Sequence, residues 1–272
     1  MGLFDIIDDI AEKQATKTET GDNRVFGVMV GTVAQNYDVT MPGRLCVSLP
    51  SRDEGNQLRW ARLAMPYGGK SWGIYFMPEV GDQVLVAFEQ GNIERPYVVG
   101  CISKTTDLFL NKTANLLNTN KRIVTYNGNA IEFEDNPGEG ASDKITIRTA
   151  GKELSTEHSI TLDNAKHKIT ITDQAGVNQI DMNTITGQME ITAATKLTIK
   201  VGEMIQLTMN GASGVTELKT KDFRVDAING ITESAVKSIN LSGGTAKLEG
   251  TSKATVSSNG PVTLEGQPIK IG

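Results

Sequence analysis

The chain is poor in the residue types that carry most protein chemistry. Its 272 residues include only two histidines and two cysteines, and 5% of them are aromatic. No Gly-x-Ser-x-Gly motif, phosphate-binding loop or zinc-type cysteine/histidine spacing occurs. Cys46 and Cys101 lie in strand-like contexts, where we expect two buried thiols, with a disulfide as the alternative. The sequence therefore predicts a protein that is not an enzyme and holds no cofactor.

Long apolar runs and excess positive charge are also lacking. No stretch approaches the roughly eighteen apolar residues that span a bilayer. The N-terminus is unlike a secretory signal peptide, because Asp5, Asp8 and Asp9 interrupt its apolar residues. A net charge of -5 argues against nucleic acid and against an anionic membrane surface, since both are bound through cationic groups.

A short repeat dominates the last third of the chain. Two large apolar residues separated by one polar residue return about every eight positions, with a looser turn at residues 211–214 and a one-residue slip after Leu241. This triplet has the two-residue period of a strand with one buried face, and turn-forming residues fill the intervals. The predicted core positions are Met189, Ile191, Leu197, Ile199, Ile205, Leu207, Phe223, Val225, Ile239, Leu241, Val262, Leu264, Ile269 and Ile271.

An eight-residue repeat cannot close a packed coil within one chain, because a single-chain solenoid needs roughly twenty residues or more per turn. Three copies that each supply one segment per layer would bury the apolar face on a shared axis. Each large aliphatic residue gains roughly 1.5 to 3 kcal/mol when it is fully buried. The repeat therefore predicts an intertwined homotrimeric triple-stranded β-helix, and makes stability inseparable from assembly.

The segments ahead of the repeat have different patterns. Leu3, Ile6, Ile7 and Ile10 fall at helical spacing, which predicts a short amphipathic helix with an acidic outer face, used for docking at a terminus or for contact with a neighbouring protein. A polar linker follows. The strand-like alternating runs of the next domain are Val25–Val33, Arg44–Leu49, Trp60–Met65, Gln83–Phe88 and Tyr97–Ile102.

Five strands in about eighty residues fit a small barrel of the oligonucleotide/oligosaccharide-binding (OB) type, although periodicity alone also allows other five-stranded barrels. The predicted fold class is thus all-β, with an N-terminal OB-fold barrel followed by the trimeric β-helix. The predicted domains are residues 1–23 (helix and linker), 24–102 (barrel), 103–140 (polar connector and start of the β-helix) and 141–272 (needle).

Four sequence blocks resemble a known family in their order and spacing. They are Gly43–Pro50 (GRLCVSLP), Trp60–Ala64 (WARLA), Trp72–Phe88 (WGIYFMPEVGDQVLVAF) and Gly91–Gly100 (GNIERPYVVG). Together they look like the barrel of the central spike proteins of contractile injection machines, which comprise the phage baseplate assembly protein V spikes and the VgrG-type spikes. Residues 122–135 are similar to the start of the β-helix in that family, and wider-spaced segments of the same kind follow at Lys144–Arg148, Ser159–Asp163, Lys168–Thr172 and Gln179–Asn183.

The resemblance implies a homotrimeric, membrane-piercing spike in the tail baseplate of a virion or a related injection system, made in the host cytoplasm. Sheath contraction would drive it through the bacterial envelope. VgrG-type chains carry large hub domains before the barrel, so the short segment here implies a separate trimeric hub protein. The C-terminus also lacks the His-x-His apex of some phage spikes, which implies a separate small tip protein similar to the PAAR-type caps.

Some residues allow a chemical interpretation beside the structural one. His158 and His167 lie in phase with the inward residues Ile160 and Ile169, so each could form a three-imidazole ring on the axis that holds a metal or anion. The alternative is a strand-end histidine that is hydrogen-bonded or faces solvent. Apart from an ion on this axis, we expect no cofactor.

The acidic and aromatic clusters each have a purely structural interpretation beside the functional one. Glu132, Glu134 and Asp135 form the densest carboxylate group, which a glycan hydrolase would need, yet a turn at a strand end explains them. The aromatic residues Trp60, Trp72, Tyr75 and Phe76 could stack on bases, but we interpret them as barrel and trimer core. The alternative functions are thus a β-helical polysaccharide-degrading tailspike and a nucleic-acid-binding barrel with a stalk.

Overall fold

The computed structural model describes residues 24–50, 55–138, 142–150 and 157–270. The amphipathic helix expected at residues 2–13 lies outside this range. Apart from the one-turn 3-10 helix η1 (Glu89–Gly91) and the short helix α2 (Leu108–Thr113), every regular element of the described chain is a β-strand. Among these residues no helix has the length and apolarity to cross a membrane. The expected all-β class is confirmed.

The first domain is a closed five-stranded barrel with the order β1-β2-β3-β5-β4. Its strands are β1 (Val28–Gln35), β2 (Arg44–Leu49), β3 (Gln57–Leu63), β4 (Gln83–Phe88) and β5 (Pro96–Ile102). All neighbours are antiparallel except β3 and β5, which pair in parallel through Arg62–Tyr97 and Leu63–Val98. The sequence predicted all five strands, and the bounds of β2 and β4 agree with the expectation. β1 begins later than predicted because Gly27 has φ +96°, a conformation outside the strand region.

The turn before β4 shows how local sequence sets the barrel. Gly81 has φ +96°, and its N–H donates to the Val33 carbonyl over 2.9 Å while Val33 N–H donates to the Asp82 carbonyl over 3.0 Å. The Asp82 carboxylate closes the turn by accepting from the Glu79 N–H over 2.9 Å. These bonds join the turn to β1, so β4 enters the barrel beside β1, with which it pairs.

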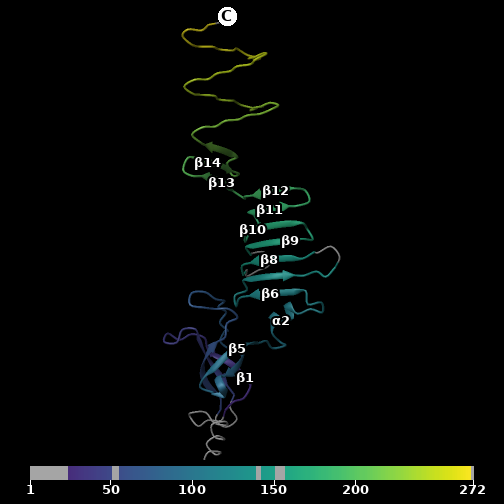
Figure 1. Cartoon of the computed structure of the whole chain (residues 1–272). Coiled ribbons are helices and arrows are strands. Elements are labelled where there is room, and N and C mark those ends of the chain that lie inside the picture. Colours follow the sequence, from purple (N-terminus) through teal and green to yellow (C-terminus); the bar gives the residue numbers. More distant parts are fainter. Residues whose placement is uncertain (1–23, 51–54, 139–141, 151–156, 271–272) are drawn as a thin grey trace, which may run out of the picture. The chain divides into compact units, whose positions relative to one another are not determined.

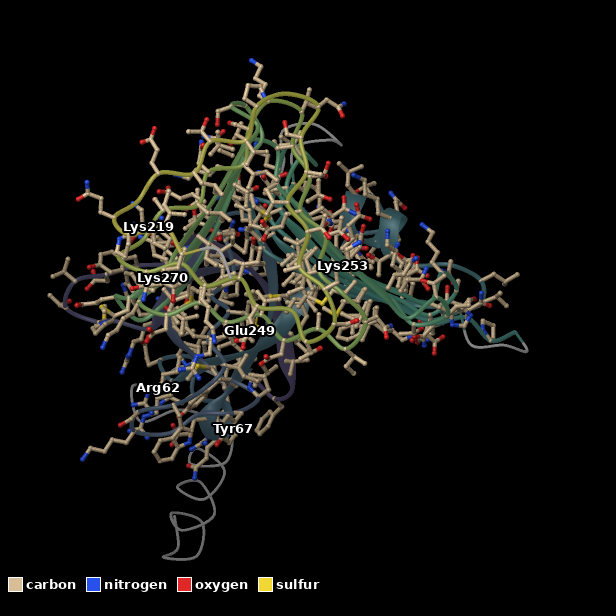
Figure 2. All side chains as sticks on the ribbon, turned by 90° about the horizontal axis from the view of Figure 1, so that it is seen from above. Arg62, Tyr67, Lys219, Glu249, Lys253 and Lys270 are labelled. Carbon is tan, nitrogen blue, oxygen red and sulfur yellow. The ribbon has the colours of Figure 1, made fainter. Side chains whose placement is uncertain are left out.

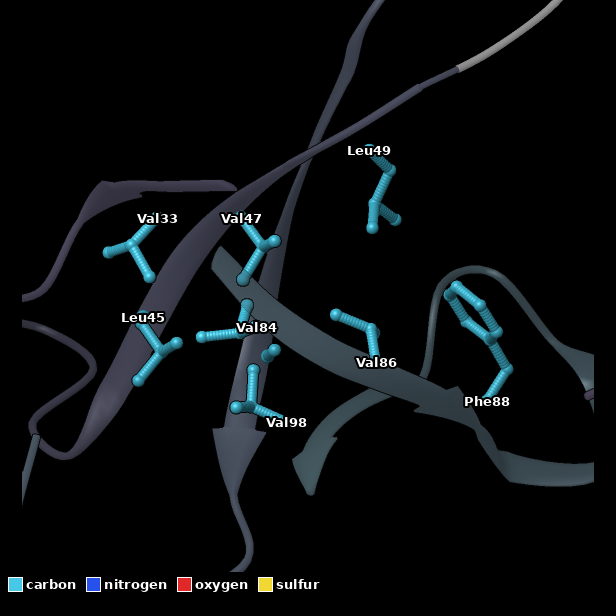
Figure 3. Close-up of a cluster of buried hydrophobic side chains, with 9 residues drawn as sticks. Val33, Leu45, Val47, Leu49, Val84, Val86, Phe88 and Val98 are labelled. Carbon is cyan, nitrogen blue, oxygen red and sulfur yellow. The ribbon is translucent and has the colours of Figure 1, made fainter. Parts of the chain in front are cut away.

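Alternate residues of the strands fill the barrel (Figure 3). Leu45, Val47, Val84, Val86 and Val98 are almost completely excluded from solvent. Residues between them lie on the other face of their strands, as the two-residue period requires, and Cys46 is buried on that face as well. Val33, Leu49, Ala61 and Phe88 complete this cluster.

Cys46 in β2 is buried, as expected, but Cys101 in β5 is exposed, so the expectation of two buried thiols is wrong for Cys101. Both thiols are free. Cys101 pairs with Val84 across the β4–β5 ladder and lies one residue before the end of β5. The bulge between Leu85 and Val86 changes the phase of this ladder, which a sequence alternation cannot reveal.

The second sheet has seven strands in chain order, from β6 to β12 (Figure 1). They are β6 (Asn120–Val124), β7 (Ala130–Glu134), β8 (Lys144–Arg148), β9 (Ser159–Asp163), β10 (Lys168–Thr172), β11 (Gln179–Asn183) and β12 (Gln188–Thr192). Each strand pairs antiparallel with the next. From Lys144 to Thr192 the strands of the described chain therefore pair as hairpins. The homotrimeric β-helix expected for residues 141–272 stays a prediction.

Short polar side chains close these hairpins. Asp163 Oδ1 accepts from the Lys166 N–H over 2.9 Å, and Asn183 Oδ1 accepts from the Ile185 and Thr186 N–H groups over 3.0 and 3.1 Å. Asp173 Oδ1 likewise accepts from the Val177 N–H over 2.9 Å. Asp and Asn stabilise tight turns in this way. Turns of this kind bring neighbouring strands of one chain together, as in the hairpins of this sheet.

The repeat region begins as a third sheet, with the order β13 (Lys196–Val201), β14 (Ile205–Asn210) and β15 (Val215–Lys219). The turn predicted at residues 211–214 separates β14 from β15. β15 itself was not expected, because the predicted repeat resumes only at Phe223. The helix α2 was likewise missed within the segment predicted as a polar connector.

From residue 220 to residue 270 no strand or helix is assigned, although every residue of this stretch is described. In Figure 1 this segment, drawn in green to yellow, runs back and forth in long passes. All its side chains from residue 221 onward are exposed, and Figure 2 shows them as sticks, with Glu249, Lys253 and Lys270 labelled. This stretch, which we call the open coil, buries nothing by itself.

Candidate assembly surface

Two apolar rows cross the seven-stranded sheet. The cross-strand register aligns one isoleucine from each strand, and we call these residues the isoleucine row: Ile123, Ile131, Ile147, Ile160, Ile171, Ile180 and Ile191. A second row runs beside it two residues away: Lys121, Phe133, Ile145, Leu162, Ile169, Met182 and Met189. Residues two apart on a strand point to the same side. The two rows therefore form one face of the sheet, the apolar face.

The apolar face is largely uncovered in the single chain. Ile147 is 44% exposed, Ile160 39%, and Ile191 at the last strand 48%. A groove along the isoleucine row is lined by Ile147, Ile160, Ile171, Ile180, Ile191 and Leu197. A contiguous apolar surface of this kind on a soluble protein marks a site of association. The sheet has a single layer in the described chain, so its apolar face requires a partner.

The opposite face is polar and makes its own contacts. Its central row is Arg122, Glu132, Thr146, Thr161, Thr170, Asp181 and Glu190. Glu132 accepts from Arg122 Nε over 2.7 Å and from Arg148 Nε over 3.0 Å, and Arg148 Nη1 also donates to Glu157 over 3.0 Å. These charged groups are thus paired within the chain, although the buried Thr146 Oγ1 in the same row has no hydrogen-bond partner. The asymmetry in charge between the faces indicates that the apolar one is available for assembly.

The Glu132 carboxylate is held in its charged form. Its partial burial opposes ionisation, but the hydrogen bonds and positive charges of Arg148 and Arg122 outweigh that effect and lower its pKa. The pKa of Arg148 is raised by the same contact. A carboxylate with a lowered pKa stabilises the folded state above its ordinary pKa of 4.5, and that stabilisation is lost as the pH falls through the folded-state value.

We expect Glu132→Gln to lower the unfolding free energy at pH 7 by about 1 to 3 kcal/mol, because charge-assisted hydrogen bonds are lost while Arg122 remains in place. The difference from the unsubstituted protein should shrink below pH 4.5, where the carboxylate becomes protonated. Thermal unfolding across this pH range measures both effects. The control is Glu134→Gln, whose half-exposed ion pair with Lys144 should contribute about 0 to 1 kcal/mol. Equal losses for the two variants would contradict the assignment.

In the single chain the side chains at the predicted core positions of the repeat are exposed or half-buried. Met189 and Ile191 lie on the apolar face, while Leu197 and Leu207 are half-buried in the third sheet. Ile199 and Ile205 are also in that sheet and are exposed. Phe223, Val225, Ile239, Leu241, Val262, Leu264 and Ile269 lie exposed along the open coil. Ile271 is outside the described residues, and the role of the whole set in a trimer core stays a prediction.

The two histidines each precede a strand, and because these strands are antiparallel, the histidines lie at opposite edges of the sheet. His158 precedes β9 and its carbonyl accepts from the Thr149 N–H over 3.0 Å. His167 precedes β10, has φ +49° and accepts from the Thr184 N–H over 3.0 Å. Both flank the apolar face instead of lying in its central rows. Among the described residues, no group of three or more His, Cys, Asp and Glu side chains could hold a metal ion.

The acidic cluster is engaged in ion pairs. Glu132 lies in the middle of β7, so the predicted strand-end turn does not account for it. Glu134 pairs with Lys144 over 2.9 Å, and Asp135 pairs with Lys121 over 3.1 Å. These cations neutralise the carboxylates that a glycan hydrolase would use.

Three of the aromatic residues lie outside the barrel core. Trp60 in β3 is half-buried, but Trp72, Tyr75 and Phe76 are exposed in the loop between β3 and β4. The prediction that these three belong to the barrel core is therefore wrong. They lie in a loop held by the Gly68–Gly73 bridge, so no barrel strand directs them inward. Their place in a trimer core stays a prediction.

Upstream of Met189 the sequence predicted the strand segments from Lys144 to Asn183 and the inward residues Ile160 and Ile169, but not the two rows that they form. These rows begin at Ile123, but the loops between β6 and β10 differ in length, so the apolar pairs do not return at a constant interval. The signal that could have found them is the recurring pattern of two apolar residues around one polar residue, as in Ile145-Thr146-Ile147 and Ile169-Thr170-Ile171. Pairing this pattern across hairpins, without a fixed period, gives the two rows.

Comparison with known proteins identifies the domain family of the barrel. Residues 29–102 match the model of the Type VI secretion system/phage-baseplate injector OB domain. The chain is 32% identical over 129 residues to the Type VI secretion system spike protein VgrG5 of Pseudomonas aeruginosa. This match covers 43% of the present chain and 16% of VgrG5.

Two further spike proteins of Pseudomonas aeruginosa are similar to the chain. VgrG1c is 28% identical over 122 residues, and VgrG1a is 27% identical over 122 residues. Each match covers 41% of this chain, and it spans 17% of VgrG1c and 19% of VgrG1a. The chain therefore matches less than a fifth of the length of these curated relatives. The barrel at residues 29–102 belongs to the injector OB domain family, and the chain that carries it is a relative of the VgrG-type spike proteins.

Proposed function

We propose that the protein is a homotrimeric, non-enzymatic spike at the tip of a contractile phage tail or a related injection system. The observation that carries the proposal is uncovered apolar surface, which is present in the isoleucine row and, separately, along the open coil. Three copies would place their apolar faces around one axis and leave the polar faces, with the Arg122–Glu132–Arg148 contacts, in water. The injector OB domain and the VgrG-type relatives support a spike role.

The two parts of the shaft would assemble differently. In the seven-stranded sheet, each chain would supply one complete wall of a three-sided prism, because its strands are already paired within the chain. In the open coil, strand pairing would come from the other two copies, which would lie between successive passes of the chain. Each pass would then be hydrogen-bonded to its neighbours, so bending the needle would break many bonds together. Such a shaft can transmit the force of sheath contraction and pierce a bacterial envelope.

The partners follow from this arrangement. The barrel would attach the spike to a separate trimeric hub protein. A small tip protein, similar to the PAAR-type caps, would bind on the C-terminal side of the needle. We place the assembled spike in the tail baseplate of a virion or in the equivalent part of a secretion machine.

Native mass spectrometry of the full chain tests the proposal. We expect an assembly of three times the chain mass of 29.3 kDa, stable on dilution, with the apolar face and the open coil protected from hydrogen exchange. A folded monomer at low concentration, with residues 220–270 protected, would refute the trimer and the spike together. Incubation with bacterial surface glycans tests the non-enzymatic part of the proposal, since cleavage would contradict it.

A further inference from the structure

The barrel carries an arginine-rich row on its outer surface. Arg44 of β2 pairs directly with Arg62 of β3, and Arg62 pairs with Tyr97 of β5. The Arg62 guanidinium lies over the Tyr97 ring, 5.9 Å from its centre, and Arg62 is labelled at the surface in Figure 2. A pocket is lined by these three residues together with Trp60, Glu89, Glu94, Arg95 and Pro96. We call it the arginine pocket.

The carboxylates of the arginine pocket are already used. Glu94 pairs with Arg59 over 2.9 Å. Glu89 accepts from the Tyr97 hydroxyl over 2.9 Å and lies 3.7 Å from Arg95. Among the ion pairs of the described residues, none includes Arg44 or Arg62.

Two like charges directly opposite each other on neighbouring strands repel. Arg44 and Arg62 are such a pair. A carboxylate placed between them would remove the repulsion and could accept hydrogen bonds from both guanidinium groups. The pocket therefore has the chemistry to bind an acidic segment.

The described chain begins beside this pocket. Arg24 donates from Nη1 to the Gln90 carbonyl over 2.6 Å, and the Val25 N–H donates to the Gly91 carbonyl over 2.9 Å. Gln90 follows Glu89, which lines the pocket. Arg24, the first described residue, therefore lies near the rim of the arginine pocket.

Those 23 residues are acidic. They contain six carboxylates and two lysines, and four of the carboxylates, Asp5, Asp8, Asp9 and Glu12, lie within eight residues of one another. Twelve residues lead from Glu12 to Arg24, and an extended chain of that length spans about 40 Å. The linker is therefore long enough for this acidic stretch to contact the pocket.

We propose that residues 5–12 of the chain dock in the arginine pocket, with aspartate carboxylates bound by Arg44 and Arg62. Trp60, half-buried at the edge of the pocket, offers an apolar surface for the isoleucines of the same segment. Docking would hold the start of the chain against the barrel and define the surface that a neighbouring protein meets there. This inference does not depend on the trimer.

Hydrogen exchange of the full-length protein, measured by mass spectrometry, tests the docking. At low salt we expect amides of residues 5–12 to exchange on the order of tenfold more slowly than an unprotected chain. Both Arg44→Glu/Arg62→Glu and Asp8→Arg/Asp9→Arg should abolish this protection, and combining the two double substitutions should restore it. The control Lys104→Glu changes a cation outside the pocket and should leave the protection unchanged.

Several results would overturn the proposal. One is the absence of protection in the unsubstituted protein, and another is protection that survives Arg44→Glu/Arg62→Glu. Exchange of the β4 amides shows whether the barrel of each variant is folded. If Arg44→Glu/Arg62→Glu is unfolded, the test depends on Asp8→Arg/Asp9→Arg, and protection of residues 5–12 that persists in that variant refutes the docking. If the arginine variant loses binding of a hub protein while protection persists, the pocket belongs to the hub. The native mass of the same samples shows separately whether the trimer is present.

Discussion

We expect Ile160→Asp to convert the proposed trimer into single chains. Ile160 lies at the centre of the isoleucine row, between Ile147 and Ile171 in the cross-strand register. Around a shared axis the substitution would bring three carboxylates together in an apolar environment, where an unpaired charge is too costly to bury. Native mass spectrometry and light scattering after size-exclusion chromatography should show the loss as a fall from three chain masses to one.

The neighbouring residue provides the control. Thr161 follows Ile160 on the same strand and lies in the polar row, paired with Thr146 and Thr170. Thr161→Asp adds the same charge to the other face, which would be in water, so the trimer should persist. Dissociation of both variants would mean that the sheet tolerates no charge on either side. Persistence of both would place the assembly surface somewhere else.

The two parts of the shaft should differ in their dependence on assembly. Strands β6 to β12 already have their internal ladder bonds within one chain, whereas residues 220–270 have no assigned strand. Buried backbone groups that lack partners are strongly destabilising, so the open coil can become a needle only when other copies supply those partners. Folding of the sheet can therefore precede association, and folding of the coil accompanies it.

The sequence predicted the barrel well because its signals are local. Alternation along Arg44–Leu49 and Gln83–Phe88 identified two strands at their observed bounds, and the turn that Asp82 closes directly precedes the second of them. The bulge between Leu85 and Val86 escaped prediction because it depends on the pairing with β5.

The candidate surface was predicted only in part for a related reason. A search for a constant interval finds the pairs from Met189 onward, where the spacing is regular, and misses the rows that begin at Ile123. The contacts of Glu132 with Arg122 and Arg148 join residues 10 and 16 positions apart, and only the strand register brings them together. Register depends on the lengths of the hairpin loops, which composition and periodicity do not specify.

We expect Leu45→Ala to destabilise the barrel by about 2 to 5 kcal/mol. Leu45 is completely buried and belongs to the cluster formed by Val33, Val84 and Val98 (Figure 3). Removing its side chain loses apolar burial and leaves a cavity, which the closed barrel can fill only in part because its strands are paired all round. Unfolding in denaturant, followed by the fluorescence of Trp60 in β3, should show the loss as a lower transition midpoint.

The same substitution on the outside of the barrel is the control. Leu58 of β3 is 56% exposed, so Leu58→Ala should change the unfolding free energy by less than about 0.5 kcal/mol. Native domains have about 5 to 15 kcal/mol of stability in total, so the loss at Leu45 is a large share of what the barrel has. The slope of the transition should stay the same in both variants, because neither alters the surface exposed on unfolding. A midpoint that falls equally for the two leucines would mean that the barrel core is not the cluster around Leu45.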